Sequence, residues 1–190
     1  MSEIKLGTGG ASISGSGANL VSASPINFGG NWIDAPPGTV ITSNSAALAS
    51  SFSTTSDNNT DTGHACAIVR KLAGGSTSGT SKCFVYLMGG CRNSNNANSQ
   101  AVSVLYRKIN SGSDSELRYM DASYGAGTES AWTPHSAFYE DASASSGSAG
   151  DTITYKMYCR SRGGSHNVAY HDVIGGVSHD VWLVVQEVVN

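Results

Sequence analysis

Short apolar stretches separated by turn-forming residues run along most of this chain, which is typical of β-strands. The clearest is Thr152–Arg160, where apolar and polar side chains alternate at every position. No window of a dozen residues has helical periodicity with good helix formers. The pattern predicts about eight or nine short strands. The main ones are Thr39–Thr42, His64–Lys71, Cys83–Met88, Ala101–Ile109, Leu117–Tyr124, Ser136–Glu140, Thr152–Arg160, Val168–Val173 and His179–Asn190.

Two of these strands are apolar on both sides instead of alternating. In the last strand Trp182 and Val184 point one way, Val181, Leu183 and Val185 point the other way, and Cys83–Met88 has the same character. A two-sheet sandwich covers only the inner face of a strand. Large exposed apolar surfaces usually mark interfaces, so we expect another copy of the chain to cover the outer face. The alternative is a loop that lies over the sheet.

The chain divides by composition into an arm, residues 1–37, and a domain, residues 38–190. The arm is rich in Gly and Ser and cannot close a core alone. It nevertheless carries Ile26, Phe28 and Trp32, which suits a segment that docks on a partner; a flexible leader is the alternative. The expected fold class is all-β, an antiparallel two-sheet jelly-roll sandwich with an extended N-terminal arm.

Composition narrows the class of protein further. Charged residues make up only 13% of the chain, and the 23 glycines accompany many small polar residues, which suits a β-rich extracellular or virion-type protein. The net charge of -3 gives no basic footprint for nucleic acid and no attraction to a membrane surface. The first residues do not resemble a signal peptide, so we expect synthesis in a cytoplasm without export by the usual route.

Chemical motifs are scarce. There is no Gly-x-Ser-x-Gly elbow, phosphate-binding loop or dinucleotide fingerprint, and no carboxylate pair can be nominated, so we expect neither catalytic residues nor a cofactor. The four cysteines do not have zinc-site spacing and are interpreted as small buried apolar residues. A cluster of His166, His171 and His179 with neighbouring aspartates could bind an ion, but loop histidines without metal are the favoured interpretation.

Three segments resemble a family of bacteriophage virion proteins. After a Gly/Ser/Thr-rich loop comes Ser81–Val85, a small polar run leading into an apolar strand. Glu140–Ala144 together with Asp151–Ser161 is similar to the family's signature, Asp-Ser-x-Ser followed later by Thr-x-Tyr-Lys-x-x-x-Arg-Ser. The closing Val181–Val188 resembles its terminal apolar strand with a glutamate. The resemblance extends over about residues 38–190 and leaves the arm outside; His171-Asp172 and His179-Asp180 depart from the pattern.

The resemblance implies a trimeric jelly roll like that of tumour necrosis factor, found in tail fibres and other virion appendages of cyanophages and marine phages. We therefore expect a non-enzymatic virion protein, a short homotrimeric tail fibre that contacts host-surface polysaccharide. Capsid decoration, as a cement protein or head fibre, is the alternative within this class, and a polysaccharide hydrolase is the alternative of another class. The expected trimer interface consists of Phe84, Tyr86, Met88, Val181, Leu183 and Val185.

The remaining expected sites lie in the arm and beside the loops of the domain. Ile26, Phe28 and Trp32 of the arm would dock on other virion proteins. Aromatic side chains beside Asn- and Ser-rich loops suit saccharide recognition by stacking and hydrogen bonding, with ordinary loop packing as the alternative. The candidate host-contact residues are Asn95, Asn96, Tyr124, Trp132 and His135.

Overall fold

The computed structural model describes the backbone of residues 2–6, 11–15, 26–28, 31–33, 37–48, 51–93, 100–124, 132–162, 168–170, 173–174, 177–178 and 180–190. It describes side chains for residues 37–48, 51–89, 100–120, 136–162 and 180–190. The chain separates into two compact units, Met1–Pro36 and Pro37–Asn190, one residue before the division expected from composition.

In the described part of the first unit, four short strands form two antiparallel pairs. Strand β1 (Ser2–Leu6) pairs antiparallel with β2 (Ala11–Gly15), and β3 (Ile26–Phe28) pairs antiparallel with β4 (Asn31–Ile33). The segment expected as an extended arm therefore has local pairing of its own. The side chains of Ile26, Phe28 and Trp32 lie outside the described residues.

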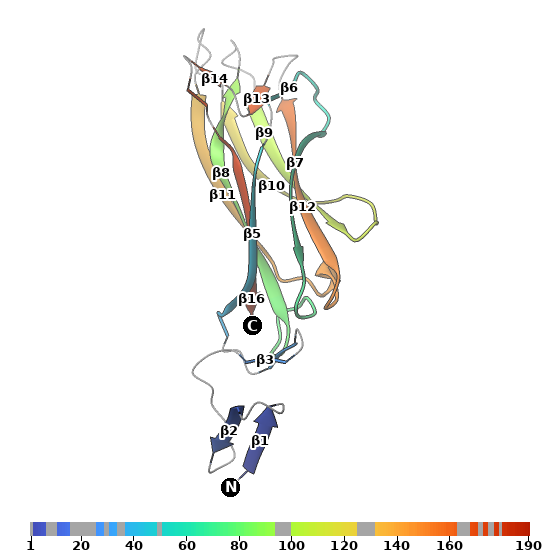
Figure 1. Ribbon diagram of the computed structural model, residues 1–190. Helices are drawn as coiled ribbons and strands as arrows, with labels where there is room; N and C mark the ends of the chain where they lie inside the picture. Colours follow the sequence, from blue (N-terminus) through green and yellow to red (C-terminus); the bar gives the residue numbers. More distant parts are fainter. Residues whose placement is uncertain are drawn as a thin grey trace. The chain divides into compact units, whose positions relative to one another are not determined.

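The second unit is an all-β sandwich of two antiparallel sheets (Figure 1). One sheet has the order β10–β9–β12–β7 and the other the order β5–β16–β8–β11. The long strand β8 pairs with β16 along its first part and with β13 at its end. Strand β13 therefore lies beyond β16 in the second sheet, and β6 pairs with β13. The strands are β5 (Val40–Ala47), β6 (Phe52–Thr54), β7 (Thr60–Val69), β8 (Ser81–Asn93), β9 (Gln100–Ile109), β10 (Ser115–Tyr124), β11 (Trp132–Asp141), β12 (Thr152–Arg162), β13 (Val168–Tyr170) and β16 (Trp182–Val189).

The chain changes sheet at most of its connections, and this order is that of an eight-stranded jelly roll, as the strand pattern predicted. Two further short strands, β14 (Val173–Ile174) and β15 (Val177–Ser178), pair with each other, and a 3₁₀ turn spans Ala144–Ser146. The C-terminus of the chain lies beside the start of the second unit (Figure 1). There the Val189 carbonyl accepts a hydrogen bond from the Gly38 N–H at 2.8 Å.

The apolar core lies between the sheets. It is built by alternate residues of the strands, of which Ile153, Tyr155, Met157 and Cys159 of β12 are all at most 1% exposed. Cys66, Cys83 and Cys159 are buried and none of them forms a disulfide, which confirms the interpretation of these three cysteines. Burial raises the pKa of the Cys66 and Cys83 thiols. The side chain of Cys91 lies outside the described residues.

A buried ionic network ties the start of β8 to the end of β16. Glu187 is fully buried and accepts hydrogen bonds from the Ser81 hydroxyl at 2.6 Å and from the N–H groups of Lys71 and Leu72. The Arg70 guanidinium lies 3.7 Å from the same carboxylate and donates to the Ser81 carbonyl. All these polar groups have partners, as burial requires. The network therefore fixes β16 in register beside β8.

A second buried network joins the two sheets. Arg107 of β9 donates to both carboxylate oxygens of Asp141 on β11, the shorter distance being 2.7 Å. The Tyr155 hydroxyl of β12 donates to the same carboxylate at 2.8 Å. Burial is the largest cause that raises the pKa of Tyr155 well above its ordinary value. The two sheets are thus held face to face by polar contacts as well as by apolar packing.

Candidate functional site

The most unusual surface of the sandwich is the outer face of the β5–β16–β8–β11 sheet. Because side chains alternate along a strand, every second residue of β8, β11 and β16 points away from the core. On this face, Met88 is 45% exposed, Phe138 is 51% exposed and Trp182 is 41% exposed. These three belong to what we call the apolar face, which comprises Phe84, Tyr86, Met88, Phe138, Trp182 and Val184.

The register of the strands brings these side chains together. Trp182 stands opposite Met88, Val184 stands opposite Tyr86, and Tyr86 has Phe138 on its other side. The Phe138 ring packs against the rings of Phe84 and Tyr86, with centroids 5.3 Å and 5.2 Å apart. The apolar face is therefore continuous across three neighbouring strands.

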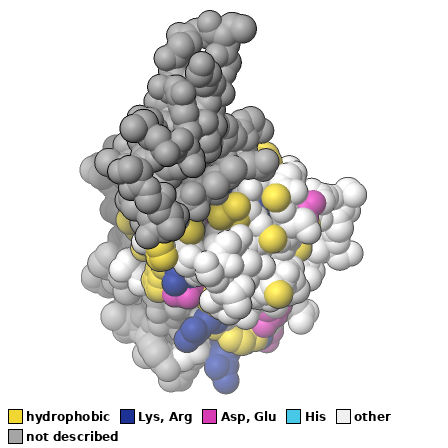
Figure 2. All heavy atoms as spheres, turned by 90° about the horizontal axis from the view of Figure 1, so that it is seen from below, with side chains coloured by type: hydrophobic (Ala, Val, Ile, Leu, Met, Phe, Trp, Pro, Cys, Tyr) yellow, Lys and Arg dark blue, Asp and Glu magenta, His cyan; other side chains and the backbone are white. Residues whose placement is uncertain are grey.

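Charge is scarce on the apolar face. Lys82 and Glu140 form an ion pair of 3.2 Å at its edge, and the Lys82 ammonium lies 5.1 Å from the Phe84 ring centroid. Figure 2 shows the described surface from below, at the end of the sandwich, where yellow hydrophobic side chains lie among white atoms and the dark blue and magenta charged side chains gather in a few places. Depletion of charged residues in the centre of a patch distinguishes protein interfaces from ordinary surface.

The outer face of the opposite sheet has the reverse character. Lys156 of β12 donates to Asp61 at 2.8 Å and to Asp114 at 2.9 Å, and Arg160 lies over the Tyr119 ring. Tyr106 donates to Glu116 from the same face. Paired charges of this kind are stable in water, so this face suits solvent and the apolar face does not.

The carboxylate of Asp114 should make stability on the polar face depend on pH. Hydrogen bonds from the Tyr158 hydroxyl and the Lys156 ammonium hold the pKa of Asp114 below its ordinary value. A lowered carboxyl pKa stabilises the fold above the unfolded value, near 3.9, and this contribution is lost as the pH falls through the folded pKa. Between pH 5 and pH 3 the wild type should therefore lose about 0.5 kcal/mol more than Asp114→Asn. Urea unfolding at each pH measures the difference.

The exposed Asp57 supplies the matched control for this experiment. Asp57→Asn should leave the wild-type pH profile unchanged because Asp57 lies outside the network of Lys156 and Tyr158. Parallel profiles for the wild type and Asp114→Asn would contradict the assignment.

The structure divides the predicted trimer-interface residues between two faces. Phe84, Tyr86 and Met88 lie on the apolar face, where another copy could reach them. Val181, Leu183 and Val185 are 0% exposed and pack between the sheets, so their prediction as interface residues is wrong. The outward residues of the last strand are Trp182, Val184 and Gln186 instead. The sequence already showed that Trp182 and Val184 form a second apolar side of this strand, and this is the side that faces outward.

Three of the predicted host-contact residues lie in strands. Trp132 and His135 belong to β11, where they pair with Arg92 and Gly89, because β8 continues to Asn93 and extends the ladder. Tyr124 is the last residue of β10. Asn95 and Asn96 lie outside the described residues, as do the side chains of the other three.

Among the residues that the structure describes, no group of three or more His, Cys, Asp or Glu side chains could hold a metal ion. The histidines at 166, 171 and 179 lie outside this part. In the same part, none of the helical structure is long and apolar enough to span a membrane.

Comparison of the chain with models of protein families and with curated proteins gave no match. The surface chemistry of the sandwich therefore has to carry the functional argument.

Proposed function

We propose that this chain is a subunit of a homotrimeric bacteriophage virion protein that serves as a short tail fibre. The apolar face carries the proposal, because a single copy leaves Met88, Phe138 and Trp182 about half exposed to water. Covering the exposed part of each would contribute on the order of 1 kcal/mol. Different parts of this face can meet between neighbouring copies, and such head-to-tail contacts form a closed ring when the rotation closes.

The other sheet fits the outside of such a trimer. Its outer face holds the Asp61–Lys156–Asp114 ion pairs, which remain hydrated when the apolar face is covered. In this arrangement the protein has a structural and binding role rather than an enzymatic one. The resemblance of residues 38–190 to phage appendage proteins supports the choice of a virion among possible locations.

The two ends of the chain would then have different partners. The first unit, with Ile26, Phe28 and Trp32, would attach the trimer to other virion proteins. Weak contacts with host-surface polysaccharide at Asn95, Asn96, Tyr124, Trp132 and His135 would gain strength from three copies in each fibre and several fibres on each virion.

The experiment that tests this function combines sedimentation with labelling of virions. Sedimentation equilibrium at micromolar concentration should give three times the chain mass of 19.5 kDa. Antibody to the protein should mark the tail in micrographs. A variant that lacks residues 1–35 should form trimers and bind host cells but be absent from virions.

Three outcomes would contradict parts of the proposal. A wild-type protein that is monomeric at micromolar concentration would contradict the proposed homotrimer. Label on the head, with fragile capsids when the protein is missing, would replace the tail fibre by capsid decoration. Release of sugars from purified host polysaccharide by the trimer would replace the binding role by hydrolysis.

A further inference from the structure

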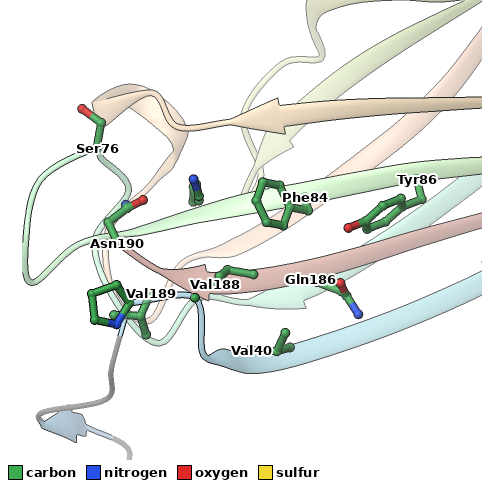
Figure 3. Close-up of a pocket in the computed structure, with 11 residues that line it drawn as sticks. Val40, Ser76, Phe84, Tyr86, Gln186, Val188, Val189 and Asn190 are labelled. Atoms are coloured by element: carbon green, nitrogen blue, oxygen red, sulfur yellow. The ribbon is translucent and has the colours of Figure 1, made fainter.

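A hollow lies at one end of the apolar face, where the sandwich begins and the chain ends. Its volume is about 490 Å³, and it is lined by side chains of β5, β8 and β16 and by the residues that flank these strands (Figure 3). Phe84 and Tyr86 form one side, and Val188 and Val40 form the floor and the other side. The volume is in the range of pockets that hold a large side chain or a small molecule.

Beside this hollow, the outward side chains become smaller from β8 to β5. Strand β8 presents aromatic rings, whereas β5, which lies beyond β16, presents Ser43 and Ser45 at the corresponding positions. The surface therefore steps down from β8 towards β5. Among the described residues of the lining, Lys82 alone has a charged side chain, and it is already paired with Glu140. An apolar occupant would therefore not strip water from an unpaired charged side chain of these residues.

Trp182 projects from the same strand that provides the floor of the hollow. It is four residues from Gln186, which is about 13 Å along a strand and too far for its indole to turn back into the hollow of its own copy. Its ring packs against no other aromatic ring among the described residues, in contrast to Phe138. One copy thus carries a projecting indole and, at a separate place on the same face, an empty space for a large side chain.

We propose that Trp182 of one copy fills the hollow of the next copy. A projection and a hollow at different places on one molecule make a head-to-tail contact, which gives a ring when the rotation closes. The amide oxygen of Gln186 in the lining can accept a hydrogen bond from the indole N–H, and a buried Trp needs such a partner. This inference rests on the proposed homotrimer and specifies which residues meet in it.

Gln186→Trp tests the inference, because an indole attached to the lining would occupy the hollow from within. Gln186 is partly exposed, so the sandwich itself should tolerate the change. We expect the dissociation constant of the trimer, measured by sedimentation, to rise about 100-fold or more, as for the loss of a well-packed Trp at each contact. Thr154→Trp places the same side chain on the outer face of the opposite sheet and should leave the constant unchanged. Circular dichroism and thermal melting of both variants check the fold.

A rescue variant separates a specific contact from general damage. Trp182→Ala alone should also weaken the trimer about 100-fold. Trp182→Ala combined with Gln186→Trp should bind more tightly than either single variant, since the hollow then supplies the indole that the neighbour lacks. The inference would be overturned if Gln186→Trp formed trimers with the wild-type dissociation constant, or if the double variant bound no more tightly than the single variants. The proposed homotrimer would not be affected by either result. A monomeric wild type would instead overturn the proposed function.

Discussion

Glu187→Leu should lower the free energy of unfolding of the jelly-roll unit by about 3–5 kcal/mol, the usual cost of breaking a buried ion pair from one side. Arg70 is 1% exposed and would remain charged inside the protein without a carboxylate beside it. The Ser81 hydroxyl and two backbone N–H groups would lose their acceptor as well. Since domains are stable by about 5–15 kcal/mol, this single change should remove a large part of the total.

The exposed ion pair on the same sheet provides the control for Glu187→Leu. Lys82 and Glu140 are 3.2 Å apart with side chains 25% and 43% exposed, so Glu140→Leu should cost less than about 1 kcal/mol. Urea unfolding at one fixed protein concentration measures both variants, because assembly would add to the apparent stability. Equal losses for the two variants would show that Glu187 has no special role.

Glu187 shows why the pattern of the last strand alone does not reveal its inner face. It has the same parity as Leu183 and Val185, and a charged residue normally marks the outer side of a strand. The structure places all three inside, because Arg70 and Ser81, more than 100 residues earlier in the chain, provide partners for the carboxylate. Alternation within one strand cannot reveal a partner so distant in sequence.

Strand β9 presents the same difficulty. Arg107 and Ser103 face the core, while Val102 and Val104 lie on the outer side and are nevertheless buried by their neighbours. The inward guanidinium pairs with Asp141, which lies just beyond the expected strand Ser136–Glu140. Where no such partner intervenes, as in β12, alternation predicted the core-facing residues correctly.

The jelly roll itself could be predicted because it depends on local signals. Short strands separated by turns, the absence of helical periodicity, and few charges all indicated a two-sheet sandwich, and the structure confirms it. Strand β11 begins at Trp132, four residues before the expected start at Ser136. It is longer than expected because its partner β8 continues to Asn93 and pairs with it along its whole length. The hollow could not be foreseen, since it arises from side chains on three strands that meet only in the fold.

Substitutions at Leu87 and Met88 distinguish the core from the proposed interface most clearly, because these residues are neighbours in β8 and point to opposite faces of the sheet. Leu87 is 0% exposed and Met88 is 45% exposed. Leu87→Asp should unfold the protein, because an unpaired carboxylate would be buried among apolar side chains. Met88→Asp should leave the sandwich folded but place three carboxylates in the trimer contacts, and we expect a soluble monomer at micromolar concentration. Circular dichroism with sedimentation equilibrium distinguishes the two results. A Met88→Asp protein that still forms trimers as tightly as the wild type would show that the copies do not meet through the apolar face.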